Sequence, residues 1–261
     1  SERVGRCLAS HYLADNDAAF ARNEDVQIGV FLANHMFLTI LEQSGVRAEY
    51  SMGLSLGEYN HLVHIGALSF EDALDLVRAR GRAYDAGPRG MMASCFPISY
   101  DDLSEAITQV NPTGLCEIVN LNSPKQQVIS GDKEAIEAVV AHLEDEYFLN
   151  PVVIERQVPM HASSFEPVSK TFASALEQAP FQIPALPYLP NRTAELEIAA
   201  QPDLFHHFKL PDGATTQQVS MGYCNDVTVK SEESTRAGGR SVRMPRVTCQ
   251  RHQSVPQGPT L

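Results

Sequence analysis

Residues 47–65 read "RAEYSMGLSLGEYNHLVHI", and Ser55 stands in this stretch between two glycines. The first seven residues are typical of a short extended segment, whereas the apolar spacing from Leu56 to Ile65 predicts a helix. Ser55 therefore lies where a strand turns into a helix. Gly-x-Ser-x-Gly is the nucleophile-elbow pattern, in which the glycines allow a tight turn and N–H groups at the helix start can stabilise an oxyanion. A chance match, with Ser55 as an ordinary loop residue, remains the alternative at this point.

The flanking segments extend this alternation of strands and helices. Residues 26–44 are apolar enough for a buried helix, and a second helix begins at Ser69, which can cap it with Asp72, and ends near Tyr84. From residue 91 to residue 158 the pattern is strand, helix, strand, strand, helix, strand. This βαββαβ order is that of the ferredoxin-like split unit, so an α/β fold is predicted.

Two further segments complete the chain. A helix is expected from about Ser164 to Leu176, with Ser163 and Glu166 in the spacing of a capping box. Residues 209–261 are rich in Ser, Thr, Gln and Arg and have no apolar periodicity, so they are predicted to form a disordered or loosely attached tail.

The charge and the cysteines of the chain exclude several classes of partner and site. The 261 residues carry a formal net charge of −12, and residues 1–208 hold 13 Lys and Arg against 28 Asp and Glu, so the body repels nucleic acid and anionic membranes. Five widely spaced cysteines without a CxxC pair predict neither a disulfide framework nor a zinc site. The longest apolar run contains Asn34 and His35 and is too short for a membrane span, and no leader opens the sequence. We therefore expect a cytoplasmic protein.

Arg80 lies on the apolar side of its predicted helix, together with Val77 and Tyr84, at about 100° per residue. A guanidinium that faces inward needs an anion, since an unpaired buried charge costs several kcal/mol. Two partners are open: an internal carboxylate such as Glu58, or the carboxylate of a bound substrate held in a bidentate fork. The second, beside a serine nucleophile, suits a malonyl-type acyl group.

A serine nucleophile needs a base within hydrogen-bond reach, usually a histidine. Among the nine histidines, His161 in "QVPMHASSF" lies in a short loop between a predicted strand and a predicted helix, where side chains can face a cleft. His61 and His64 are three residues apart inside the elbow helix, and no carboxylate motif accompanies them. We therefore expect His161 as the base and no metal site.

Residues 53–81, "GLSLGEYNHLVHIGALSFEDALDLVRARG", resemble the active-site segment of malonyl-CoA:acyl carrier protein transacylases and of polyketide synthase acyltransferases, whose signature is Gly-His-Ser-x-Gly-Glu. Three more segments are similar to that family in the same order: "IVNLNSPKQQVISG" (118–131), "VPMHASSFEPV" (158–168) and "LPNRTAE" (189–195). An arginine also follows the serine by 25 residues, as it does in the family. The resemblance covers about residues 25–208.

The resemblance implies a fold and a domain organisation. The family has an α/β-hydrolase-like large subdomain with an inserted ferredoxin-like small subdomain. These would be residues 1–89 with 159–208, and residues 90–158. The first core strand of the family, with the sequence Gly-Gln-Gly, has no counterpart here, and the tail (209–261) resembles nothing in the family. The chain is therefore expected to be an incomplete copy, a misjoined reading frame or a variant that a partner completes.

The resemblance assigns the chemistry to a Ser-His pair. Ser55 corresponds to the nucleophile, His161 to the general base, and the N–H of Leu56 to one oxyanion donor. The implied reaction is ping-pong: an acyl-CoA acylates the serine, and the phosphopantetheine thiol of an acyl carrier protein then takes the acyl group. An acyl-CoA such as malonyl-CoA and an acyl carrier protein are the implied partners, in fatty-acid or polyketide biosynthesis, and no cofactor is implied.

The resemblance also implies a substrate pocket. Arg80 would bind the malonyl carboxylate and select diacid acyl groups. Gln27 matches the glutamine of the family's Thr-Gln segment, although the threonine is not kept, and Leu54 stands where the family has histidine. Asn122 and Met160 complete the expected lining.

Two other functions stay open on the sequence. A serine esterase or thioesterase would use the same elbow but needs an acidic residue near His161, for which Asp132 is the loop candidate, and it has no need of Arg80. A truncated, inactive relative would at most bind a carrier protein.

Overall fold

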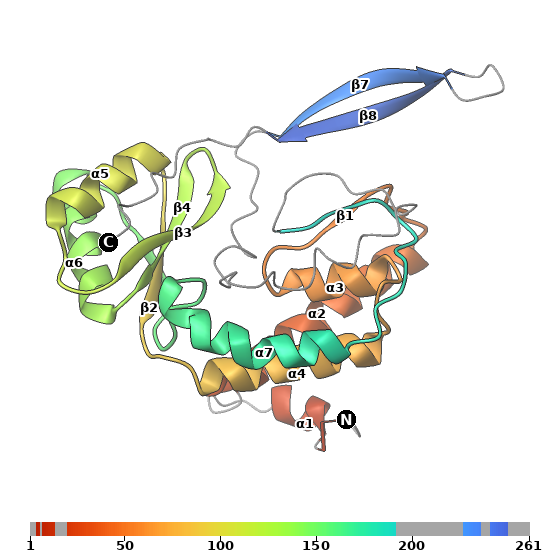
Figure 1. Ribbon diagram of the computed structural model, residues 1–261, viewed down its shortest axis with the longest axis horizontal. Helices are drawn as coiled ribbons and strands as arrows, with labels where there is room; N and C mark the ends of the chain where they lie inside the picture. Colours follow the sequence, from red (N-terminus) through yellow and green to blue (C-terminus); the bar gives the residue numbers. More distant parts are fainter. Residues whose placement is uncertain (1–3, 6, 14–19, 192–226, 236–240, 250–261) are drawn as a thin grey trace.

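The computed structural model describes residues 4–5, 7–13, 20–191, 227–235 and 241–249. Figure 1 shows two main groups of elements, one built mostly of helices and one built around a four-stranded sheet. This mixed content confirms the predicted α/β class. The subdomain boundaries expected from the sequence stay a prediction.

The helical group surrounds one apolar core. Its helices are α1 (Leu8–Tyr12), α2 (Asn23–Gln43), α3 (Gly57–His64), α4 (Phe70–Asp85) and α7 (Glu166–Gln178). The buried side chains that they share include Ile28, Phe31, Ile65 and Val77. The predicted helices over 26–44, 56–65 and 69–84 are thus confirmed to within a few residues.

Helix α4 is fixed at its start and near its end. The Ser69 hydroxyl accepts a hydrogen bond from the Asp72 N–H at 3.0 Å, which confirms the predicted cap. Further along, α4 crosses α2 at Gly81, where a Cβ atom would lie 2.4 Å from the Cα of Glu24. Because only glycine permits this approach, α4 lies against the start of α2, and Arg80 comes to lie next to Gln27.

A short parallel pair of strands ends at the candidate site. β1 (Ser51–Met52) pairs with β6 (Tyr188–Leu189), so segments far apart in the sequence lie side by side. Residues that follow two parallel strands meet at the same edge, where functional residues of α/β folds usually gather. Ser55 and Asn191 both occupy such positions.

The second group is an antiparallel sheet with helices on one face. Along the chain the elements are β2 (Met91–Cys95), α5 (Tyr100–Val110), β3 (Cys116–Ser123), β4 (Gln126–Gly131), α6 (Lys133–Glu146) and β5 (Val152–Glu155). The sheet order is β3-β4-β2-β5, and every neighbouring pair is antiparallel. Helices α5 and α6 pack on the same side around Leu103, Ile129, Ile136 and Leu143 (Figure 1). The element order is the βαββαβ sequence that the patterning predicts.

The start of α7 differs from the predicted capping box. Residues Ser163–Phe165 form a 3₁₀ turn, and Phe165 rather than Ser163 precedes α7, with no side-chain cap. The Ser163 N–H instead donates to the Glu117 carboxylate at 2.6 Å, and Glu166 pairs with Lys170 at 2.7 Å. The contact with β3 therefore replaces the local box, so that prediction is wrong.

Part of the predicted disordered tail has regular structure. β7 (Val227–Thr235) and β8 (Ser241–Cys249) form an antiparallel hairpin. β-branched residues at 227–229 favour extended backbone, a signal that the absence of longer periodicity concealed. The other residues of the tail, and 192–208, lie outside the described part of the chain. Within that part, no helix is long and apolar enough to cross a bilayer.

Candidate active site

The chain makes a strained turn at Ser55. Its φ of 50° lies in the left-handed region, which costs a non-glycine residue on the order of 1 kcal/mol. The preceding glycine allows the turn, since a Cβ atom on Gly53 would lie 2.1 Å from the carbonyl oxygen of Gly57. Ser55 is thereby placed two residues before the start of α3, as the nucleophile-elbow pattern predicts.

The predicted base lies beside the predicted nucleophile. His161 Nε2 lies 3.1 Å from Ser55 Oγ across 106 residues of sequence. His161 also has a left-handed φ, 68°, and is 4% exposed. In the tautomer protonated at Nδ1, Nε2 accepts the serine proton. Burial, and then the charge of Arg80, lower the pKa of His161 to about 3, so the imidazole is neutral and able to act as a base at physiological pH.

Arg80 is buried beside the same serine oxygen. Its guanidinium donates to Gln27 Oε1 at 2.8 Å and to Ser55 Oγ at 3.2 Å, and it lies 4.4 Å from the centroid of the Tyr84 ring. Within the described ranges, no carboxylate lies at salt-bridge distance from it, so the alternative ion pair with Glu58 is not formed. A buried cation held by neutral groups is prepared to receive an anion.

The other predicted site residues divide into two groups. Gln27 is 3% exposed and holds Arg80, and Leu56 is the residue before α3, where backbone N–H groups have no intrahelical acceptor. Leu54 is 52% exposed. Met160 is packed between α4, α7 and the four-stranded sheet. Asn122 lies in β3, and no contact with the serine is recorded in the described part of the structure.

The acid that an esterase triad needs is not beside the base. The Asp132 carboxylate accepts the Leu115 N–H at 2.8 Å at the start of α6. His161 Nδ1 is buried and has no hydrogen-bond partner among the residues that the structure describes. The arrangement there is thus a Ser-His pair with a nearby cation.

Two contributors to the site were not predicted from the sequence. Asn191 accepts a hydrogen bond from the Ser55 N–H at 3.3 Å through its side chain, 136 residues away. Tyr84 stacks on the guanidinium of Arg80. The spacing of Tyr84, four residues after Arg80 on one helix face, is a signal that could have found it. Asn191 lies just after an extended segment and within the family-like segment 189–195, but neither signal indicates a contact with Ser55.

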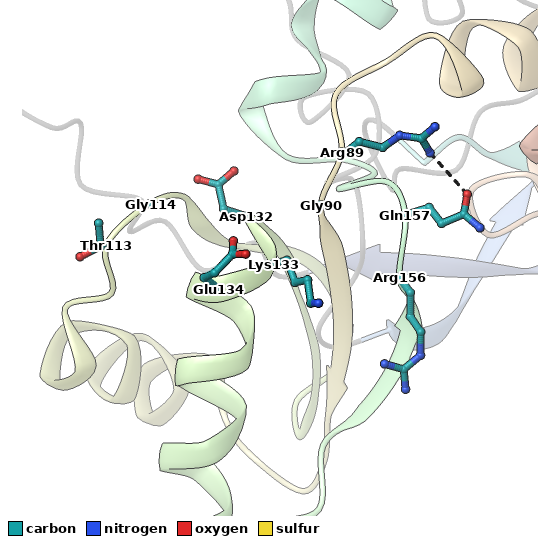
Figure 2. Close-up of a pocket in the computed structure, with 9 residues that line it drawn as sticks. All are labelled: Arg89, Gly90, Thr113, Gly114, Asp132, Lys133, Glu134, Arg156 and Gln157. Carbon is teal, nitrogen blue, oxygen red and sulfur yellow. Dashed lines mark hydrogen bonds between the residues drawn. The ribbon is translucent and has the colours of Figure 1, made fainter.

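A separate surface pocket lies beside the four-stranded sheet (Figure 2). Arg89 and Arg156 line it from the β2 and β5 side, and Asp132 and Glu134 line it from the start of α6. These exposed side chains carry charges of both signs, and of the candidate residues named from the sequence only Asp132, the acid of the esterase alternative, is among them. No group of three or more His, Cys, Asp or Glu among the described residues is arranged to hold a metal ion.

Comparison with known proteins decides the family. The model of the acyl transferase domain family matches residues 8–210, which is most of the chain. The chain belongs to this family. A malonyl CoA-acyl carrier protein transacylase of Bacillus subtilis is 32% identical over 161 residues, covering 59% of this chain and 39% of that protein. The chain spans between 39% and 58% of the length of three curated relatives that it matches.

Solved structures of family members show the same fold. The malonyl CoA-acyl carrier protein transacylase of Clostridium perfringens is 27% identical, with a TM-score of 0.70 over 85% of this chain and 68% of that one. A malonyl-transacylase in complex with a type II polyketide synthase acyl-carrier protein is 25% identical, with a TM-score of 0.71 over 85% of this chain and 70% of that one. This chain therefore has the α/β fold of those enzymes.

Proposed function

We propose that this chain transfers a malonyl-type acyl group from CoA to the phosphopantetheine thiol of an acyl carrier protein, through an acyl-Ser55 intermediate. The observation that carries the proposal is that one atom, Ser55 Oγ, is within hydrogen-bond distance of both His161 Nε2 and the Arg80 guanidinium. A nucleophile, a neutral base and an unpaired cation thus meet where a diacid thioester would react.

The proposed reaction has two half-reactions at that atom. In the first, His161 takes the proton of Ser55 as the oxygen attacks the thioester carbonyl, and the N–H of Leu56 stabilises the oxyanion. CoA leaves as the thiol, taking the proton back from the imidazole. In the second, the carrier-protein thiol gives its proton to His161 and attacks the acyl ester, so the acyl group leaves on the new thioester and Ser55 is protonated again.

Arg80 gives the proposed reaction its choice of substrate. The malonyl carboxylate would accept from the guanidinium in a bidentate fork, with Gln27 continuing to hold one of its nitrogens. An acetyl group offers no such acceptor, so the cation would stay buried and unpaired. Leu54, Met160 and Asn122 are assigned to the lining of the acyl pocket within this proposal.

The relatives support the partners and the architecture that we propose. The matched proteins are named for malonyl CoA and an acyl carrier protein. One solved relative is in complex with an acyl carrier protein. We assign residues 1–89 with 159–208 to an α/β-hydrolase-like subdomain and residues 90–158 to a ferredoxin-like insertion. The sheet order β3-β4-β2-β5 agrees with that insertion. Acyl-CoA acts as a substrate, and the proposed chemistry uses no cofactor.

Intact mass spectrometry tests the proposal. The protein is incubated with malonyl-CoA, and a malonyl adduct is expected on the wild type and on Ser104→Ala, a matched control in α5, but not on Ser55→Ala. Addition of a carrier protein bearing phosphopantetheine should remove the adduct and increase the mass of the carrier. Steady release of malonate without transfer would mean a thioesterase, and an unchanged mass would mean an inactive relative.

A further inference from the structure

Asn191 holds the strained turn from both sides. Its side-chain Oδ1 accepts the Ser55 N–H at 3.3 Å, and its Nδ2 donates to the carbonyl of Gly53 at 2.5 Å. The two backbone groups flank Leu54, so one amide spans the peptide units that set the direction of the Ser55 side chain. Asn191 is 6% exposed and follows β6, the strand that pairs with β1, which places its amide at this edge.

Glu58 in turn holds Asn191. In the first turn of α3, its carboxylate oxygen Oε1 accepts the Asn191 N–H at 3.0 Å. The hydrogen bonds therefore form a closed connection that runs from Gly53 and Ser55 to Asn191, on to Glu58, and back through the chain to the turn. Neither side chain contacts the serine hydroxyl, which His161 and Arg80 already occupy.

These contacts also determine which backbone N–H remains available to stabilise an oxyanion. The N–H of Ser55 is occupied by Asn191, whereas that of Leu56 stands at the start of α3 and has no intrahelical acceptor. Rotation of the turn would move the serine oxygen and the Leu56 N–H together, away from His161. A left-handed residue keeps its conformation only where its surroundings hold it.

We propose that Asn191 and Glu58 are a positioning pair that holds the Ser55 turn in the geometry that reaction requires. The pair rests on the proposed role of Ser55 as nucleophile, but not on the identity of the acyl group. Loss of either side chain leaves Arg80 and Gln27 in place, so substrate binding persists while the reaction slows. A displacement of about 1 Å at a reacting centre lowers a rate on the order of a hundredfold.

The test measures the reactivity of Ser55 with and without the malonyl group. The rate constant for modification by a fluorophosphonate reports an activated serine alone, and kcat and KM for malonyl loading report the full reaction. The variants are Asn191→Ala, Asn191→Asp, Glu58→Ala and Glu58→Gln. The control is Asn60→Ala, since Asn60 is a buried asparagine in α3 that bonds to Phe31 and Asn34 and not to the turn.

The expected pattern separates positioning from folding. Asn191→Ala and Glu58→Ala should lower the fluorophosphonate rate constant and kcat by about 10- to 100-fold, with KM unchanged within about twofold. Glu58→Gln should stay near the wild-type rate, because its amide oxygen accepts the same N–H. Asn191→Asp keeps an acceptor for Ser55 but cannot donate to Gly53, so it should fall between. Asn60→Ala should lower Tm but not the rate per folded molecule.

Three results would overturn the inference. These are wild-type reactivity in folded Asn191→Ala or Asn191→Asp, an equal loss in Asn60→Ala, and no fluorophosphonate labelling of the wild type. If malonyl loading is absent but labelling follows the expected order, the proposed function fails and the positioning pair stands.

Discussion

Replacement of Arg80 should remove the preference for malonyl groups without removing the reactivity of Ser55. A carboxylate bound by the guanidinium gains two charge-assisted hydrogen bonds of about 1.5 to 3 kcal/mol each. It displaces the hydrogen bond from the guanidinium to Ser55 Oγ, worth about 1.5 kcal/mol at the low end of the same range, whereas the contact with Gln27 can remain. The net loss in Arg80→Ala is therefore about 3 kcal/mol, or on the order of 100-fold in malonyl loading. Acetyl loading lacks these bonds and should change less than about tenfold.

The assay follows the mass of the protein over time with malonyl-CoA and, separately, with acetyl-CoA. Arg80→Lys is the informative companion variant, since it keeps a charge but loses the planar fork and should recover only part of the malonyl rate. Thermal unfolding of each variant accounts for the amount of folded protein. Equal losses for malonyl and acetyl groups in folded Arg80→Ala would refute the reasoning and leave the guanidinium with a structural role.

Four further outcomes are expected. Arg80→Gln should shift the acidic limb of the pH dependence of fluorophosphonate labelling upward, because the guanidinium is one cause of the lowered pKa of His161; an unmoved limb would contradict this. Burial raises the pKa of Glu58 from 4.5 to about 7, so the free energy of unfolding of the wild type should fall relative to Glu58→Gln as pH rises through that window, by at most about 3 kcal/mol in chemical denaturation; a constant difference would argue against it. Gly53→Ala should abolish labelling or folding, because its Cβ would overlap the backbone of α3; a reactive, stable variant would refute the close approach. Ser69→Ala should destabilise the fold by about 1 kcal/mol at full activity, measured by denaturation, and no change would mean that the cap is dispensable.

The sequence patterns predicted those elements whose formation depends on residues that are close together in the chain. The cap at Ser69 depends on atoms within three residues. The alternation of strands and helices from Met91 to Glu155 follows from short apolar patterns, because the side chains of these elements pack on one sheet. The Gly-x-Ser-x-Gly pattern predicted the turn at Ser55, and at Gly53 no other residue fits the approach of α3. The inward direction of Arg80 followed from helical periodicity alone, and the structure places it 6% exposed.

Contacts across long stretches of sequence could not be predicted in this way. The capping box at Ser163 had the correct residues, but Glu117, 46 positions earlier, takes the N–H that the box would have used. The sequence also allows Glu58 as an ion-pair partner of Arg80, yet its carboxylate accepts a hydrogen bond from the backbone of Asn191, 133 positions later. In both cases a residue had two plausible partners, and the choice depended on how strands and helices pack, which periodicity does not encode.

Arg80 links substrate choice to the strength of the base in the proposed reaction. Before a diacid binds, its charge helps to hold the pKa of His161 at about 3, where the imidazole is neutral but a weak base. A malonyl carboxylate beside the guanidinium offsets that charge, so the pKa of His161 rises and its affinity for the serine proton increases. An acetyl group leaves the charge in place and the base weak. In the proposed reaction the same cation would thus discriminate twice, once in binding and once in the proton transfer, because it lies 3.2 Å from the oxygen that His161 would deprotonate.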